Sequence, residues 1–535
     1  MGRAVIVTLY NPGAAGARYV ASSLKAAGHD VWLLHFKEFR SVGVPNHDLE
    51  AHKALESDRL LYVKFLHPGQ TVYAPYPTPI TEIERGLLIS EIHRLAPDLV
   101  AFSMFTVTVD IARGLTDLIH KELPGLPVLW GGIHCLLEPE HCVQTADIVC
   151  TGEGEDAAVE LMNRWGEYKE KGALDTDGLW FRRDGDIVRN PSRPLIEDLD
   201  RLPFPTYGAQ ELLIDDDCVS DMMASHAELF RTGMQTLVFT ERGCPYHCSY
   251  CVHSLLNLDK AHARFRRRSV DNVLDECEQL LGRHGLRHFI FHDEIFLIQK
   301  SWVREFAAKF KERFASRGCA FTGYVHPLTT DAEMLDLMWD AGLRRTGMGV
   351  QSGSRRVTEE VFHRVWCPDR TIALSRLLAK YPFEIVQYDL LTHNPFETER
   401  ERRETFEFLL QLEPPFSVET FGLVVYPTCK MAEMTPLSAE LDRDEMLFCN
   451  MLYFLSGVPG LDRQWLRSLA DNAHYRRNPR DLENLTLEML RLNEERNRLR
   501  RETASRRVAP RIALQPIVPD GLRSRLVRLL ERIVP

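Results

Sequence analysis

The sequence predicts an α/β fold in three parts: an N-terminal domain built on a doubly wound parallel sheet, a partial (β/α)6 barrel, and a mainly helical C-terminal region. Short apolar runs alternate with helical periodicity up to about residue 165, and a second series of strand and helix units runs from about 231 to 430. After about residue 436 these motifs stop and helix-like patterns follow. We therefore expect domains at 1–165, 231–435 and 436–535, with a linker at 166–230.

The N-terminal domain is defined by its apolar runs. A buried parallel strand is a short continuous apolar run, whereas a helix repeats apolar residues at intervals of three or four. On these patterns we expect strands at 3–9, 31–36, 98–103, 127–130 and 146–150, with one helix stopping at Gly28 and another spanning 82–95. This alternation predicts a parallel sheet with helices on both faces.

The loops that follow these strands carry the candidate binding residues of the domain. Parallel sheets of this kind bind ligands beyond the carboxyl ends of their strands. Paired glycines let a large flat ligand approach the backbone, and small hydroxyl side chains can hydrogen-bond a nucleotide tail. The candidates follow the third, fourth and fifth strands, and they are Ser103 and Thr106, Gly131 and Gly132, and Gly152 and Glu153.

The linker and the barrel follow. Residues 178–191 predict a hairpin with Asp184 and Gly185 in its turn, and residues 193–205 are an extended, proline-rich connector. Barrels place their functional residues at the carboxyl ends of strands. We expect barrel strands at 236–240, 287–294, 319–325, 345–354, 384–391 and 416–425.

Three cysteines lie close together after the first barrel strand, at Cys244, Cys248 and Cys251. Three thiolates on one short loop can hold three irons of a cubane cluster and leave the fourth iron open to a substrate or cofactor. Two alternatives remain open. The cysteines can bind zinc with His247 or His253 as fourth ligand, although no second Cys-x-x-Cys follows, or they can be ordinary buried thiols.

The spacing Cys-x-x-x-Cys-x-x-Cys, with Tyr250 before the last cysteine, resembles the signature of the radical S-adenosylmethionine (SAM) superfamily. The resemblance implies a 4Fe-4S cluster whose open iron is chelated by SAM, reductive cleavage to a 5′-deoxyadenosyl radical, and an electron donor such as flavodoxin or ferredoxin. It also implies that Tyr250 packs near the adenine and that Asp293 and Glu294 lie near the methionine amine. Gln351 and Ser352 resemble the start of a Glu-Ser-Gly-Ser motif that reaches cofactor hydroxyls.

The N-terminal loops, ahead of a cluster motif, resemble the cobalamin-binding domain attached to many radical enzymes. The resemblance implies that Ser103, Thr106, Gly131, Gly132, Gly152 and Glu153 border cobalamin. Many such domains carry a cobalt-ligating histidine after the first strand, but this loop is residues 11–16 and has none. The cobalt then lacks a protein imidazole, or the domain has lost cobalamin. His134 is expected to be a structural loop residue rather than an alternative axial ligand.

Together these resemblances imply a cobalamin-dependent radical SAM enzyme that methylates an unactivated carbon of a small-molecule substrate. One alternative is a radical cyclase or rearranging enzyme with the same cofactors and no net methyl transfer. A different class is a non-catalytic zinc-binding scaffold. The basic amphipathic segment 522–534 suits either packing on the barrel or contact with a membrane surface or an acidic partner.

Overall fold

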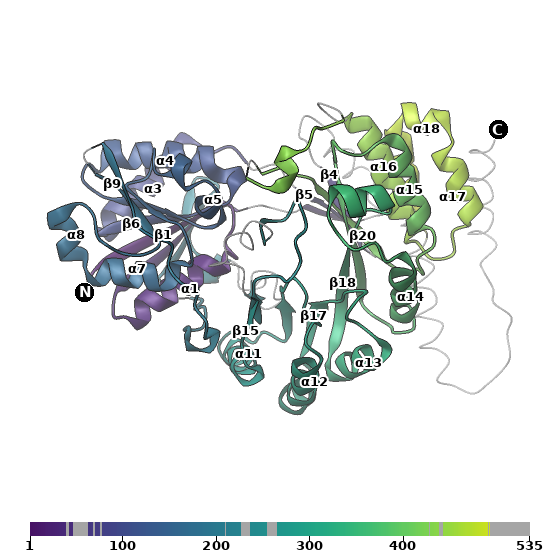
Figure 1. The fold of residues 1–535 in the computed structure, drawn as a ribbon, viewed down its shortest axis with the longest axis horizontal. Coiled ribbons are helices and arrows are strands. Elements are labelled where there is room, and N and C mark those ends of the chain that lie inside the picture. Colours follow the sequence, from purple (N-terminus) through teal and green to yellow (C-terminus); the bar gives the residue numbers. More distant parts are fainter. Residues whose placement is uncertain are drawn as a thin grey trace.

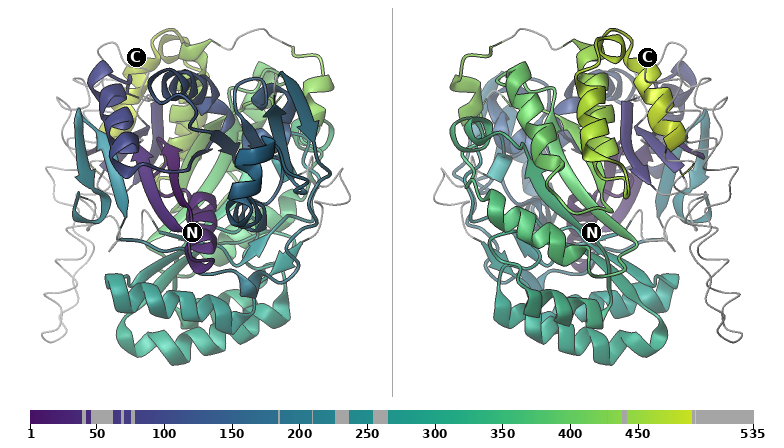
Figure 2. Two further views of the ribbon diagram at one scale, coloured as in Figure 1. Left: turned by 90° about the vertical axis from the view of Figure 1, so that its left-hand side faces the viewer. Right: turned by 90° about the vertical axis from the view of Figure 1, so that its right-hand side faces the viewer.

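Two nine-stranded sheets organise the molecule (Figure 1). The computed structural model describes residues 1–38, 42–45, 62–67, 70–74, 78–183, 185–208, 210–225, 236–253, 265–426, 428–437, 442–489 and 492. The first sheet belongs to the N-terminal domain and the second to the barrel, and the two domains lie side by side in Figure 1. In the left-hand view of Figure 2 the N-terminal domain stands in front of the barrel.

The centre of the first sheet consists of five parallel strands. Their order is β8-β7-β6-β1-β2, with β1 at Arg3–Leu9, β2 at Asp30–Phe36, β6 at Leu99–Ser103, β7 at Val128–Gly131 and β8 at Ile148–Cys150. Successive side chains of β1 enter different cores, because Val5 and Val7 pack on one face of the sheet and Ala4 and Ile6 on the other. The continuous apolar run therefore reflects burial on both faces.

Helices cover both faces of this sheet, as a doubly wound fold requires. The cores show α1 (Ala15–Ala26), α7 (Gly154–Asn163) and α8 (Trp165–Lys171) on one face, and α3 (Glu82–Leu95), α4 (Val109–Glu122), α5 (Ile133–Leu137) and α6 (Pro139–Cys142) on the other. Thr81 fixes the start of α3 through a capping box with Glu84. The predicted fold class is confirmed for this domain.

The first sheet extends into the range expected to be a linker. The hairpin of β9 (Leu179–Arg183) and β10 (Asp186–Arg189) joins one edge antiparallel to β8. At the other edge β11 (Glu211–Asp215) pairs parallel to β2, and β12 (Cys218–Asp221) follows antiparallel. The hairpin matches the sequence prediction, but residues 179–221 contribute strands to the N-terminal sheet rather than only linking two domains. The expected boundary at residue 165 therefore divides one structural unit.

The barrel contains the six parallel strands that the sequence predicts. Their order is β13-β16-β17-β18-β19-β20, at Leu237–Val238, His288–Phe291, Ala320–Tyr324, Leu343–Gln351, Ile385–Thr392 and Ser417–Gly422. The helices of its outer layer are α11 (Val270–His284), α12 (Lys300–Phe314), α13 (Ala332–Ala341), α14 (Pro368–Leu378) and α15 (Glu399–Leu409). The two strands of a short ribbon, β14 (Glu241–Arg242) and β15 (Arg266–Arg267), precede and follow the loop that carries Cys244, Cys248 and Cys251, which we call the cysteine loop.

Three strands from the N-terminal part of the chain complete the barrel sheet. They are β3 (Val42–Pro45), β4 (Tyr62–His67) and β5 (Gln70–Ala74), and β4 pairs antiparallel with β20. In Figure 1 both β4 and β5 lie in the barrel half of the molecule. A partial barrel leaves its last strand with an open edge, and this excursion covers it. The expectation that residues 1–165 form a single domain did not include this crossing.

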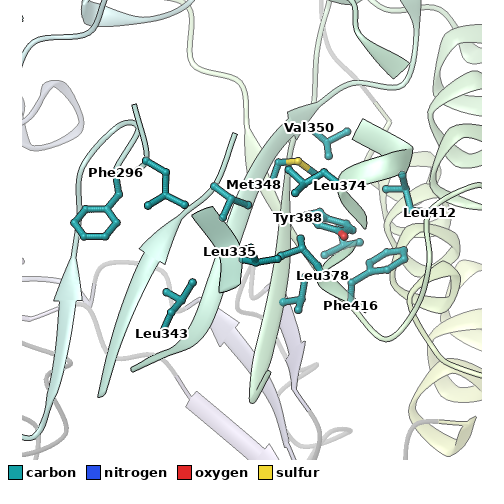
Figure 3. Packing of buried hydrophobic residues seen from close by; sticks show 14 of the residues in the cluster. Phe296, Leu335, Leu343, Met348, Val350, Leu374, Leu378, Tyr388, Leu412 and Phe416 are labelled. Atoms are coloured by element: carbon teal, nitrogen blue, oxygen red, sulfur yellow. The ribbon is translucent and has the colours of Figure 1, made fainter. Parts of the chain in front are cut away.

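The barrel core lies between the strands and the outer helices. In Figure 3 Met348 and Tyr388 from β18 and β19 meet Leu374 and Leu378 from α14. The C-terminal helices α16 (Arg443–Ser456), α17 (Arg463–Ala470) and α18 (Ala473–Arg477) pack on the side of the barrel away from the N-terminal sheet (Figure 1). A further helical stretch covers 479–489. The expected helical C-terminal region is confirmed over its described part, which ends at residue 489 apart from residue 492, and segment 522–534 lies outside the described residues.

Candidate functional site

A cavity of about 340 Å³ opens at the carboxyl ends of β1, β6, β7 and β8. This is the point where the strand order reverses around β1, and such switch points are the usual ligand sites of open α/β sheets. Five of the six residues expected to border a ligand line it: Ser103, Gly131, Gly132, Gly152 and Glu153. Gly16 of α1 lines it too, and a Cβ built there would meet no atom within 4 Å. The lining is largely apolar, with charged side chains that include Glu153 and Arg242.

Thr106 does not line this cavity. It begins the short helix η1 (Thr106–Thr108), and its hydroxyl lies 3.2 Å from Nδ1 of His134. His134 is buried on α5, with Nε2 3.5 Å from Nδ1 of His141, and burial followed by the neighbouring imidazole lowers its pKa. This supports a structural place for His134. The hydroxyl of Thr106 thus lies beside α5, and its expected place at the border of cobalamin stays a prediction.

Glycine at position 132 is required by the protein's own backbone. Its φ is 97°, and a Cβ there would lie 2.6 Å from the carbonyl oxygen of Met104. By contrast, a Cβ on Gly131 would make only ordinary contacts, the nearest being 3.8 Å away at Cys150. Of this glycine pair, Gly131 is therefore the one with room beside it for a ligand.

Glu153 joins the N-terminal sheet domain to the barrel. Its carboxylate accepts hydrogen bonds from both terminal nitrogens of Arg266 at 2.9 and 3.0 Å, from Arg242 at 2.9 Å, and from the backbone amide of Ile196 at 2.8 Å. Arg242 also donates to Glu155 at 2.6 Å. Burial opposes ionisation of Glu153, but the two arginines prevail and lower its pKa to about 2. The carboxylate thus holds the two domains together at the rim of the cavity.

We call the contacts of Glu153 with Arg242 and Arg266 the interdomain clamp. A second cavity, of about 300 Å³, extends from this clamp to the cysteine loop. It is lined from the N-terminal domain by Gly152 and Glu153, and from the barrel by residues that include Gly243, His253, Asp293 and Glu294. Several residues line both cavities: Gly152, Glu153, Phe239, Glu241 and Arg242. The glycine loop of the sheet and the start of the cysteine loop therefore face a common space.

Cys244, Cys248 and Cys251 lie on one loop after β14. The thiols are close enough to interact electrostatically, and burial raises the pKa of Cys244 to about 11 and of Cys251 to about 12. Bound iron would therefore have to stabilise their thiolates. Among the described residues no three histidine, cysteine or acidic side chains converge as a single-ion site does. A cubane needs no such convergence, because it offers a separate iron to each thiolate.

The backbone of this loop is anchored to the segment that follows β18. The amide of Ser249 donates to the carbonyl of Phe362 at 3.0 Å, and its hydroxyl donates to the carbonyl of Val361. The ring of Tyr250 packs edge-to-face on Phe362 with centroids 5.0 Å apart. The phenol oxygen lies 3.2 Å from Nη1 of Arg364. Tyr250 therefore belongs to a fixed packing layer directly beside the cysteines.

The two acidic residues after β16 have different environments. Asp293 is buried, and its carboxylate accepts hydrogen bonds from the amide and hydroxyl of Thr240 at 2.7 and 2.5 Å. Glu294 is half-exposed, with Oε1 3.1 Å from Nε2 of His253, and it lines the second cavity. Both residues line the second cavity, but the carboxylate of Asp293 is buried against Thr240 and that of Glu294 is half-exposed. The expectation that both carboxylates lie near one ammonium group stays a prediction.

Gln351 and Ser352 end strand β18. Gln351 has a left-handed φ of 66°, and its buried Oε1 has no hydrogen-bond partner among the described residues. A buried amide oxygen without a partner is costly, so it is a candidate acceptor for a ligand hydroxyl. The hydroxyl of Ser352 instead lies 3.3 Å from that of Thr405 and accepts from the amide of Ser354 at 3.1 Å. Ser352 therefore ties the strand end to α15.

Sequence reasoning missed the arginines around these cavities. Arg242 and Arg266 form the interdomain clamp, and Arg364 contacts the cysteine loop. The consecutive arginines 266–268 were a visible signal, because guanidinium groups are preferred partners for carboxylates. Nothing in the local sequence around Arg364 pointed to the cysteines, which lie more than a hundred residues earlier.

Two family models match this chain in the order that the sequence suggested. The B12 binding domain model matches residues 82–162, and the Radical SAM superfamily model matches residues 238–409. The chain therefore belongs to the radical SAM superfamily and carries a B12-binding domain ahead of its radical SAM domain. It is a cobalamin-dependent radical SAM enzyme, and the cofactors of these two domains are a 4Fe-4S cluster, SAM and cobalamin.

Individual relatives are distant. The chain is 25% identical over 346 residues to an uncharacterized methyltransferase of Pyrococcus horikoshii, covering 64% of this chain and 70% of that protein. It is 23% identical over 365 residues to the anaerobic magnesium-protoporphyrin IX monomethyl ester cyclase of Cereibacter sphaeroides, covering 65% and 54%. The solved radical SAM methyltransferase TsrM from Kitasatospora setae, with cobalamin and a [4Fe-4S] cluster bound, superposes with a TM-score of 0.57 at 19% identity, covering 81% and 74%. This likeness concerns the fold alone.

Among the described residues, no helix has the length and apolar character needed to cross a membrane.

Proposed function

We propose that this enzyme methylates an unactivated carbon of a small-molecule substrate. The observation that carries the proposal is the common lining of the two cavities, because Glu153 and Arg242 border both the sheet cavity and the space at the cysteine loop. Methyl transfer between two cofactors and a substrate needs all three within one enclosed region. Relatives that are named methyltransferases also support methyl transfer as the reaction.

The residues present suit the iron-sulfur cluster and SAM. Cys244, Cys248 and Cys251 are proposed to hold three irons of the cluster. Glu294 is proposed to hold the SAM ammonium group through a charge-assisted hydrogen bond, because it lines the second cavity and its side chain is half-exposed. The unpartnered Oε1 of Gln351 is proposed to accept from a SAM hydroxyl.

Cobalamin suits the cavity at the switch point of the sheet. Ser103, Gly131 and Gly152 are proposed to contact its nucleotide tail, because they line a largely apolar space at the carboxyl ends of the strands. Glu153 is proposed to act differently from the sequence expectation, by fixing the domains rather than by touching the cofactor. When bound, the cluster supplies the electron that cleaves SAM and cobalamin supplies the methyl group.

Isotope transfer tests the proposed reaction. The protein is purified without oxygen, reconstituted with iron, sulfide and cobalamin, and incubated with a low-potential one-electron donor, candidate substrates and SAM carrying a deuterated methyl group. The proposal predicts a product that gains the labelled methyl group, and a Cys244/Cys248/Cys251→Ala variant that yields none. A wild-type protein that takes up zinc but no iron or corrinoid would contradict the proposal.

The second candidate reaction is a cyclisation or rearrangement with the same cofactors. The match to a magnesium-protoporphyrin IX monomethyl ester cyclase favours it, although this chain covers only about half of that protein. The same experiment separates the two reactions. A product with no label, formed together with 5′-deoxyadenosine, would favour cyclisation and refute methyl transfer.

A further inference from the structure

Arg364 is a half-buried cation that contacts the cysteine loop. Its Nη1 lies 3.9 Å from Sγ of Cys248 and 3.2 Å from the phenol oxygen of Tyr250. Its Nη2 donates to the carbonyl oxygen of Gly349 at 3.0 Å. Three partners from two segments thus fix the guanidinium group, and one of them is the sulfur of a predicted cluster ligand.

The backbone holds Arg364 in this position. The segment 361–362 receives both hydrogen bonds that anchor Ser249, the residue next to Cys248. His363 then adopts a left-handed φ of 52°, and the amide of Arg364 donates to the carbonyl of Thr358 at 2.8 Å. The elements that hold the cysteine loop therefore also set the distance between the guanidinium group and Cys248.

The charges around the cysteines are of both signs. The carboxylate of Glu294 interacts electrostatically with Cys244 and Cys251, and that of Glu241 interacts with Cys244. Arg364 provides a positive charge and an N–H donor at Cys248. A cluster held by three thiolates becomes more negative when it accepts an electron. Hydrogen bonds to cluster sulfurs and nearby positive charge stabilise that reduced form and so raise the reduction potential.

We propose that Arg364 sets the reduction potential of the cluster through its hydrogen bond to Sγ of Cys248. This inference rests on the proposed binding of the cluster by Cys244, Cys248 and Cys251. The step concerned is a one-electron reduction, in which an electron passes from a low-potential donor to the cluster and no covalent bond forms or breaks. Arg364 contacts a ligand of the cluster and is therefore a tuning residue rather than a catalytic one.

Redox titration of the reconstituted full-length enzyme tests the proposal. The reduced cluster is followed by electron paramagnetic resonance in the absence of SAM, for wild type, Arg364→Gln and Arg364→Met. We expect each variant to have at least a tenfold lower ratio of reduced to oxidised cluster at a fixed potential, which corresponds to a midpoint lower by about 59 mV. The matched control is Arg355→Gln, because Arg355 is exposed and pairs with Glu359 on the same segment. This control is expected to titrate as wild type.

The outcomes separate this inference from the proposed function. A wild-type protein that assembles no cluster would overturn both. Clusters in all four proteins with equal midpoints would overturn only the role of Arg364. Equal midpoints combined with a raised KM for SAM would assign Arg364 to SAM binding instead. Folded Arg364 variants that hold no iron would assign it to cluster assembly and equally refute the tuning role.

Discussion

Replacing Glu153 by glutamine should loosen the contact between the two domains. The substitution keeps the shape of the side chain but removes the charge that faces Arg242 and Arg266. The arginines lower the pKa of Glu153 from 4.5 to about 2, which corresponds to roughly 3 kcal/mol in favour of the ionised form. The side chain of Glu153 is 17% exposed and that of Arg266 is 7% exposed, so solvent screening weakens this electrostatic free energy only slightly. We therefore expect Glu153→Gln to reduce the free energy that holds the two domains together by roughly 2–3 kcal/mol.

Hydrogen exchange measures this loss locally, which suits a chain of several domains that need not unfold in one step. The amide of Ile196, which donates to Glu153, should exchange roughly 30- to 140-fold faster in Glu153→Gln. The matched control is Asp156→Asn, whose ion pair with Arg201 is more exposed, and it should change exchange by about fivefold or less. Equal effects of the two substitutions would show that the charge of Glu153 contributes no more to this contact than an exposed ion pair does.

The stabilising effect of the interdomain clamp should weaken at low pH. The pKa of Glu153 is lower in the folded state, so its stabilising effect is present above about pH 4.5 and is lost as the pH falls toward 2. The difference between wild type and Glu153→Gln should therefore stay constant between pH 6 and pH 8. A difference that shrinks across that range would show that the carboxylate is not held in the ionised state as described.

Three further predictions concern the cavity, a buried acid and the SAM site. Gly16→Phe should fill the sheet cavity and lower the corrinoid content of the purified protein at least tenfold. Gly86→Phe, at another helical glycine with open space beside it, should leave the corrinoid content unchanged. Equal corrinoid content in the two variants would show that cobalamin does not occupy this cavity. Burial raises the pKa of Glu397 to about 8, so its favourable effect is present below about pH 4.5 and is lost as the pH rises through 8. In urea unfolding, the free energy of unfolding of Glu397→Gln should therefore rise relative to that of wild type by roughly 1.4 kcal/mol per pH unit between pH 5 and pH 8. If the two proteins lost or gained stability in parallel across this range, the pKa of Glu397 would not be raised by burial. Gln351→Leu should raise the KM for SAM about tenfold in the cleavage assay, and an unchanged KM would show that Oε1 meets no SAM hydroxyl.

The sequence predicted most individual elements because local pattern determines them. Strand β1 occupies the predicted residues 3–9 and helix α3 the predicted residues 82–95. The pairing of β4 with β20 was out of reach, because it joins segments about 350 residues apart and no local pattern specifies a partner at that distance. For the same reason the sequence predicts a linker at 211–221, whereas β11 pairs with β2 and β12 pairs with β11.

The sequence predicts which loops meet at the site, because these loops directly follow predicted parallel strands. Five of six N-terminal candidates line one cavity because the carboxyl ends of parallel strands meet at one edge. Side-chain direction was not predictable in the same way. Asp293 and Glu294 are neighbours in sequence and both line the second cavity, yet the carboxylate of Asp293 is buried against Thr240 and that of Glu294 is half-exposed. Arg364 reaches Cys248 only through the three-dimensional fold.

The most direct test of the account is the electron paramagnetic resonance spectrum of the reduced, reconstituted enzyme recorded with and without SAM. Because three thiolates leave one iron for SAM, we predict that adding SAM changes the spectrum, and that the Cys244/Cys248/Cys251→Ala variant gives no cluster signal. A wild-type cluster spectrum that stays the same at saturating SAM would show that no iron is open to SAM, and a full cluster signal in the variant would show that these cysteines do not hold the cluster.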